Sequence, residues 1–226
     1  MIPTPHPQRL ALANEVHARP PEPMRAPLTL SHIVMVCDAA GREASRQHLA
    51  ALLRDHHLPP PDEHTNHLRV DLGLFRLRWE LHTEFVAWTF SRPLAPESVA
   101  TSEPVQALSA VSQDWLAALP GQCLVSLGVW VVPRHAVGAA AWARSVLLED
   151  SLVGSSVAEG QAEVYTDFRV HPDGGSRLVV LTGSLTPIAL GRLVQQLIEI
   201  DTYRMAALRG LPAAREAGAT LASAEG

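Results

Sequence analysis

The sequence predicts an α+β fold in which mixed or antiparallel sheets are covered by packed helices. Apolar and polar residues alternate over residues 75–80, a pattern typical of a half-buried strand. Residues 123–132 form a near-continuous apolar run, which is typical of a buried strand. Thr186 followed by Pro187 is a typical helix start, and apolar residues then recur at helical spacing.

The remaining elements are predicted from the same signals. Apolar positions on the last helix are expected to face the core, and these are Leu190, Leu193, Val194, Leu197 and Ile200. We expect further helices over residues 8–18, 42–56, 103–119 and 136–149. We expect further strands over residues 28–37, 68–91 with a turn near His82, 163–171 and 177–181.

This order of elements suggests an internal repeat. The pattern of strand, helix, strand, strand and helix occurs twice, and Thr83-Glu84-Phe85 corresponds to Thr166-Asp167-Phe168. Two tandem ferredoxin-like β-α-β-β-α units would explain it, and convergent strand patterning is the alternative. The predicted division is a helix and proline-rich arm over residues 1–27, units over residues 28–120 and 121–212, and a weakly ordered tail over residues 213–226.

The composition excludes several classes of protein. The 226 residues are 47% hydrophobic with a net charge of -5, so the chain is globular rather than disordered. Arginine provides all 18 basic residues and is scattered among acids, so we expect no nucleic-acid partner. No apolar run approaches the roughly 20 residues of a membrane span. Cys37 and Cys123 are expected to be small buried hydrophobes. No motif identifies a cofactor or a metal.

The first candidate site precedes Pro20-Pro21. Asn14, Glu15, His17 and Arg19 are crowded into six residues at the end of the first predicted helix. They could present an acid, an imidazole and a guanidinium to an anionic ligand. The alternative is an exposed pair between Glu15 and Arg19 with a surface histidine.

The second and third candidate sites are strand faces. In extended chain Glu80, His82 and Glu84 share one face, which suits acid/base chemistry or a divalent metal. Asp167, Arg169 and His171 share another face that leads to Asp173, and pairing in one sheet would bring the two faces together. Ordinary solvated or structural sheet faces are the alternative reading of both.

The fourth candidate site is a polar stripe on the last helix, and a solvated surface is its alternative reading. It consists of Arg192, Gln196, Glu199 and Tyr203. Another set of histidines lies around a proline-rich loop without metal-ligand spacing and is expected to be exposed: His48, His56, His57, His64 and His67.

The four segments together resemble the uncharacterised bacterial family called domain of unknown function 3422, whose members are described as membrane-anchored. The residues that carry the resemblance are 11–21, 79–85, 166–174 and 191–205. It implies no reaction, cofactor or catalytic residue. It implies a longer protein with a helical region and a hydrophobic C-terminal anchor, through which relatives would be membrane-associated. The N-terminus of this sequence has neither the basic start nor the apolar stretch of a secretory signal, so we expect the chain as given to be cytoplasmic.

Three functions follow from these patterns. The leading hypothesis is a domain that binds a small polar or anionic ligand in one pocket lined by His17, Arg19, Glu80, His82, Glu84, Asp167, Arg169 and His171. An enzyme would use His82 or His171 as acid/base, Glu84 or Asp167 to orient it, and an arginine as anion clamp. A scaffold that docks a C-terminal helical region is the third hypothesis, and the oligomeric state is open.

Overall fold

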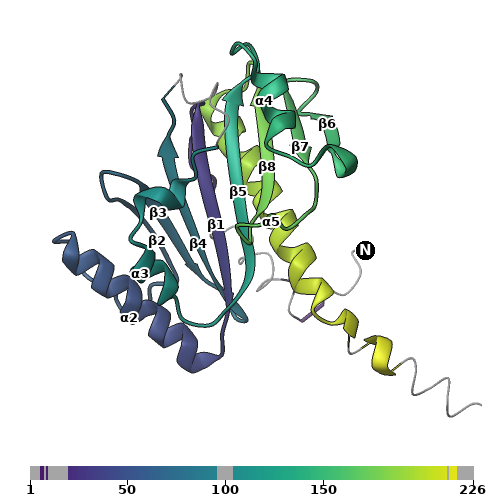
Figure 1. Cartoon of the computed structure of the whole chain (residues 1–226). Coiled ribbons are helices and arrows are strands. Elements are labelled where there is room, and N and C mark those ends of the chain that lie inside the picture. Colours follow the sequence, from purple (N-terminus) through teal and green to yellow (C-terminus); the bar gives the residue numbers. More distant parts are fainter. Residues whose placement is uncertain (1–5, 8, 10–19, 96–103, 213, 218–226) are drawn as a thin grey trace, which may run out of the picture.

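The computed structural model describes residues 6–7, 9, 20–95, 104–212 and 214–217. Its centre is one eight-stranded sheet with the order β2-β3-β4-β1-β5-β8-β7-β6 (Figure 1). The strands are β1 (Leu28–Val36), β2 (His67–Asp71), β3 (Arg76–Leu81), β4 (Phe85–Pro93), β5 (Gln122–Pro133), β6 (Val153–Val157), β7 (Ala162–Thr166) and β8 (Ser176–Thr182). The helices are α2 (Ala39–Asp55), α3 (Gln113–Ala117), α4 (Ala139–Ser145) and α5 (Pro187–Leu208), with 3-10 turns η2 (Ala107–Ala110) and η3 (Glu149–Ser151).

The sheet is mixed, which confirms the predicted α+β class. β5 and β8 are parallel, whereas the other neighbouring strands are antiparallel. The two predicted units contribute one half of the sheet each, and β1 joins β5 to make the halves continuous. The last strand of each half returns beside its first strand, but β4 is antiparallel to β1 and β8 is parallel to β5. The internal repeat and the division into two units stay predictions.

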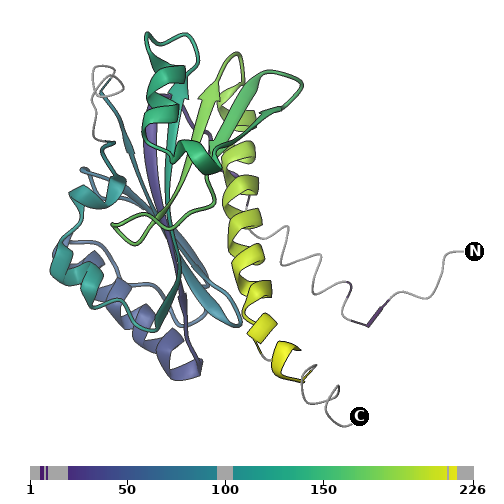
Figure 2. The ribbon, with the colours of Figure 1, turned by 45° about the vertical axis from the view of Figure 1, so that its right-hand side comes forward.

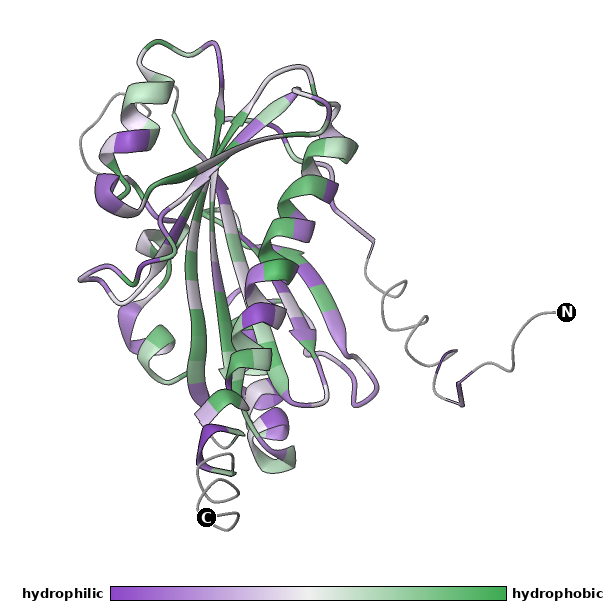
Figure 3. Cartoon of the chain, turned by 90° about the vertical axis from the view of Figure 1, so that its right-hand side faces the viewer, coloured by the Kyte–Doolittle hydropathy of each residue, from purple (hydrophilic) through white to green (hydrophobic). Residues whose placement is uncertain are grey.

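The two faces of the sheet are covered by different helices. α5 packs on one face, which we call the α5 face, and α2, α3 and α4 lie on the other, the α2 face (Figure 2). Alternation along β1 sets this division, because Leu30 and Val34 pack in the core under α5 whereas Ile33 and Met35 pack in the core under α2. Both faces are therefore buried, and the central strands are mainly apolar (Figure 3).

α5 begins as predicted, with Thr186 accepting a hydrogen bond from the Ala189 amide and with Pro187 in the first turn. Its buried residues recur mainly at steps of four: Leu190, Gly191, Val194, Ile198 and Thr202. The expectation that Ile200 faces the core is wrong, because 66% of this residue is exposed. Two residues past Ile198 correspond to about 200° of helical rotation, which turns Ile200 towards solvent.

Several predicted bounds need correction. Residues 103–119 do not form one helix, because Val111 is extended and Ser112 caps a new helix, α3. Residues 68–91 contain three strands, with a second turn where the Leu72 amide bonds to the Phe75 carbonyl. The exposed strand β6 was not predicted. The helix predicted over residues 8–18 falls almost entirely outside the described residues.

Gly191 is where the proline-rich arm meets α5, and this contact gives a first prediction. A Cβ at Gly191 would overlap the carbonyl oxygen of Glu22, and the nearby Met24 amide bonds to the Pro187 carbonyl at 2.9 Å. We expect Gly191→Ala to lower the free energy of unfolding by about 2 kcal/mol, despite the gain of about 1 kcal/mol in helix propensity. Urea denaturation measures this. Gly210→Ala is the control, since its Cβ would meet the nearest atom at 3.7 Å; an equal loss in both variants would contradict the prediction.

Candidate functional site

A cavity of about 110 Å³ lies between α5 and strands β1, β3 and β4, and we call it the α5 cavity. Its apolar lining includes Met24 from the arm, Leu30, Phe85 and Ile198. Its polar lining comes from the side chains of these strands that point to the α5 face, from the arm and from α5 itself: Glu22, His32, Arg76, Arg78, Glu80, His82, Thr89, Ser91, Gln195, Glu199, Thr202 and Tyr203. The cavity therefore combines an apolar body with many polar groups, which is typical of small-molecule sites.

His32 is the central polar residue of the α5 cavity. It lies on β1 directly opposite Thr89 of β4, and its side chain points towards α5. Its Nδ1 is 2.8 Å from Thr89 Oγ1 and its Nε2 is 3.1 Å from Thr202 Oγ1. Burial, followed by the charges of Arg78 and His82, lowers the pKa of His32 to about 3. His32 is therefore neutral, with one ring nitrogen donating to a threonine hydroxyl and the other accepting.

Arg78 and Glu80 form a nearly buried ion pair on the β3 wall of the cavity. Arg78 Nη2 is 2.6 Å from Glu80 Oε1, and the two side chains are 13% and 7% exposed. Arg78 Nη1 also donates to Gln195 Oε1 of α5 at 3.2 Å. Arg78 Nε is buried and meets no acceptor in the described part of the chain. This N–H is a donor that a ligand could satisfy.

The arm places a carboxylate against the other arginines of this wall. Glu22 lies 3.5 Å from Arg76 and 3.9 Å from Arg69, which directly faces Arg78 on the neighbouring strand. Arg69 also donates to the Pro20 carbonyl, and burial lowers its pKa. Positive and negative groups thus alternate along the wall, and its net charge is small.

The second candidate segment is divided by a turn, as predicted near His82. The His82 amide bonds to the Phe85 carbonyl at 2.9 Å and closes the hairpin between β3 and β4. Glu80 and His82 line the α5 cavity, and the His82 ring stacks on Phe85 with centroids 4.2 Å apart. Glu84 lies in the turn and is exposed, so the prediction of one face shared by all three residues is wrong.

The polar stripe of α5 is also divided. Glu199 and Tyr203 line the α5 cavity, and Gln195 donates to the Glu199 carboxylate at 2.7 Å. Arg192 and Gln196 are exposed and are not among the lining residues. The stripe spans more of the helix circumference than the cavity does, so only its edge reaches the site.

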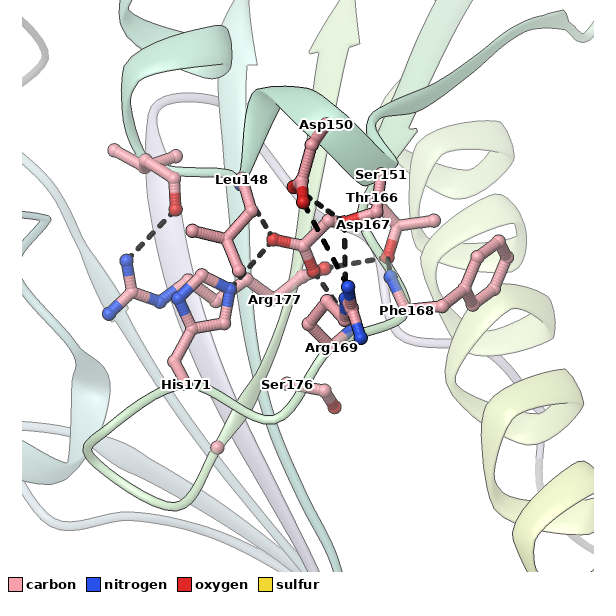
Figure 4. Close-up of polar contacts among 12 residues, drawn as sticks. Leu148, Asp150, Ser151, Thr166, Asp167, Phe168, Arg169, His171, Ser176 and Arg177 are labelled. Carbon is pink, nitrogen blue, oxygen red and sulfur yellow. Dashed lines mark hydrogen bonds and ion pairs between the residues drawn. The ribbon is translucent and has the colours of Figure 1, made fainter.

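The third candidate segment lies on the other side of the sheet. β7 ends at Thr166, so residues 167–175 form a loop rather than the predicted strand face. Asp167 Oδ2 accepts from the Leu148 amide and from His171 Nε2, both at 2.8 Å, and its Oδ1 accepts from the Arg169 amide at 3.1 Å (Figure 4). Leu148 follows α4, which covers the α2 face, so this carboxylate points away from α5. The structure does not join Asp167 and His171 to the cavity.

The charged neighbours of this loop are also engaged locally. Arg169 Nε donates to Ser151 Oγ at 3.4 Å, and its Nη2 is 3.9 Å from the Asp150 carboxylate (Figure 4). Asp173 accepts from Arg177 at 3.2 Å and from Gln106 at 2.9 Å. These contacts hold the loop to β8 and to the segments around α4 and η2.

Three further expectations concern the first candidate site, the histidines around the proline-rich loop and the two cysteines. Asn14, Glu15, His17 and Arg19 lie outside the described residues. His48 is half-buried rather than exposed, because its ring stacks on Trp115 with centroids 4.3 Å apart and its Nε2 is 3.1 Å from the Trp115 carbonyl oxygen. The two cysteines are less buried than expected, since Cys37 is half-buried and Cys123 is exposed.

Neither a metal centre nor a membrane span is found in the described ranges. These residues contain no group of three or more histidine, cysteine, aspartate or glutamate side chains that could hold a metal ion. No helix within them is long and apolar enough to cross a membrane.

His32 was not among the predicted site residues. The available signal was a single histidine between Leu30 and Val34 on one side of the strand, where the other residues are apolar. Such a residue must find polar partners when it is buried. Thr89 and Thr202 provide them, and neither could be assigned to His32 without the sheet register and the position of α5.

The fold and the α5 cavity define the chain as a mixed-sheet domain with a partly polar pocket. The family described as "Protein of unknown function (DUF3422)" matches residues 4–226, so the chain belongs to this family. Comparisons with curated proteins and with solved structures gave no match. The family assignment confirms the resemblance, and it brings no reaction or ligand with it.

Proposed function

We propose that this domain binds a small polar or anionic ligand in the α5 cavity. The observation that carries the proposal is the buried Arg78 Nε, a donor without an acceptor in the described ranges, on the wall of a cavity that also contains the neutral His32. An oxygen acceptor such as a carboxylate would satisfy this N–H. The apolar body of the ligand would contact Leu30, Phe85 and Ile198.

The mixture of positive and negative charges on the cavity wall limits the chemical class of ligand that the cavity would bind. Three carboxylates, those of Glu80, Glu22 and Asp71, balance the three neighbouring arginines, so a compact multivalent anion has no excess positive charge to bind. A monovalent acceptor with an apolar body fits better, because it uses both the guanidinium and the apolar lining. The volume of about 110 Å³ has room for one small organic acid.

Three probes test this proposal: hexanoate, hexanol and inorganic phosphate. We expect hexanoate to raise the melting temperature, while hexanol and phosphate have little effect. A hundredfold excess over Kd stabilises a protein by about 2.7 kcal/mol. Arg78→Gln should remove the response to hexanoate, whereas Arg192→Gln, on the exposed side of α5, should keep it. A wild-type protein that responds to none of the three, or an equal response in both variants, would contradict the proposal.

A further inference from the structure

The two edges of the eight-stranded sheet differ in how they are protected. The β2 edge has Arg69 and Asp71, and the arm contacts Arg69 through Pro20 and Glu22. The β6 edge has the sequence Val-Gly-Ser-Ser-Val, with no charge and no proline. Natural edge strands usually have charges, prolines or bulges that prevent pairing with another chain. β6 has none of these devices.

β6 is also accessible and regular. Its residues 153–156 are exposed, and Val153 is 48% exposed. Its register with β7 is unbroken from Val153 opposite Thr166 to Val157 opposite Ala162. It is the last strand on its side of the sheet (Figure 1). An exposed edge of this kind presents main-chain donors and acceptors to an incoming strand.

We propose that β6 pairs with β6 of a second copy of this chain, in antiparallel orientation about a two-fold axis at Ser155. The strand is nearly symmetric about this residue, as an isologous contact requires. The axis places Val153 opposite Val157 and Gly154 opposite Ser156, so apolar residues meet apolar ones and small residues meet small ones. No like charges face each other within the strand pair.

Charges just outside β6 favour the same antiparallel arrangement. The antiparallel pairing places the turn that follows β6, which contains Glu159, beside the start of β6 in the second copy, just after η3 ends at Ser151. The Arg169 guanidinium is held at Ser151 by a 3.4 Å hydrogen bond, and its side chain is 57% exposed. Glu159 is exposed as well. The two-fold axis therefore brings Arg169 and Glu159 together twice, and Arg169 would exchange its long 3.9 Å contact with Asp150 for this pair.

A five-residue strand pair with two exposed ion pairs forms a small interface. We expect a reversible dimer with Kd on the order of micromolar or weaker. The ion pairs are solvent-exposed, so the dimer should weaken as the salt concentration rises.

Light scattering and sedimentation velocity over a micromolar concentration series test the pairing. We expect the wild type to pass from monomer to dimer. Ser155→Lys should stay monomeric, because it places two positive charges opposite each other on the axis. Ser155→Thr is the matched control and should keep the dimer. Ser155 is exposed, so neither variant should change the melting temperature of the monomer. A wild type that is monomeric throughout, or a dimer that Ser155→Lys leaves intact, would overturn the proposal.

Exchange of the two charges tests the register. Glu159→Arg and Arg169→Glu should each raise the Kd of the dimer severalfold, and the double variant should restore most of the affinity. Equal weakening in the double variant would exclude the proposed register. Neither residue lines the α5 cavity, so these results are independent of ligand binding there.

Discussion

His32→Ala should lower the free energy of unfolding by about 3 kcal/mol at neutral pH. The substitution removes a fully buried ring and leaves the hydroxyls of Thr89 and Thr202 without their partner. Thr89 belongs to the sheet and Thr202 to α5, so the loss also loosens the contact between them. Chemical denaturation measures the effect. His135→Ala removes an exposed histidine and should change stability by less than about 0.5 kcal/mol.

His32 also makes the free energy of unfolding depend on pH, and the direction of this dependence follows from its lowered pKa. The pKa of His32 is about 3 in the folded chain, against 6.5 for the unfolded group. Between these values the unfolded state binds a proton that the folded state does not. The contribution of neutral His32 is therefore complete above pH 6.5 and is lost as the pH falls towards 3, at about 1.4 kcal/mol per unit at most.

The effect of His32 is isolated by comparing the free energy of unfolding of the wild type with that of His32→Gln at each pH, because other groups titrate equally in both. The stability difference should be largest near pH 7 and should shrink below pH 6.5. Glutamine keeps an amide that can bond to one threonine and does not titrate in this range. A difference that stays constant from neutral to acidic pH would show that His32 is not held neutral by the fold.

The parts of the fold that sequence analysis predicted correctly depend on local signals. The Thr186 cap and Pro187 set the start of α5, and the apolar run of β5 identifies a strand that is buried on both faces. Elements whose type is decided by the tertiary structure were missed. β6 has exposed, mainly small residues, so its sequence has no alternation to reveal a strand.

The candidate site was predicted in part. Four of the predicted residues line the α5 cavity, because the periods of strand and helix turn them towards it. They are Glu80, His82, Glu199 and Tyr203. The joining of Asp167 to this group was wrong, because its carboxylate lies on the α2 face, where it bonds to the Leu148 amide. His32 pairs with residues 57 and 170 positions away, and no spacing rule connects positions so distant. The segments rich in polar residues therefore predicted part of the cavity wall, but they did not predict His32.

Asp167→Ala should lower the free energy of unfolding by about 3 kcal/mol at neutral pH. The carboxylate is fully buried, and its loss leaves the Leu148 amide, the Arg169 amide and the His171 ring without an acceptor. Asp167→Asn should cost almost as much. Donors approach both oxygens, so the new NH₂ group must face one of them in either orientation.

The pH range of this effect differs from that of His32. Burial alone would raise the pKa of Asp167, but the hydrogen bonds from Leu148, Arg169 and His171 outweigh it and hold the pKa below its usual 3.8. The contribution is therefore complete above pH 3.8 and is lost only as the pH falls below it. Asp150→Asn is the control, since it breaks a 3.9 Å exposed pair and should change stability by less than about 0.5 kcal/mol. Hydrogen exchange should show faster opening of residues 167–175 in Asp167→Ala, and unchanged protection there would contradict a role for Asp167 in holding this loop to α4.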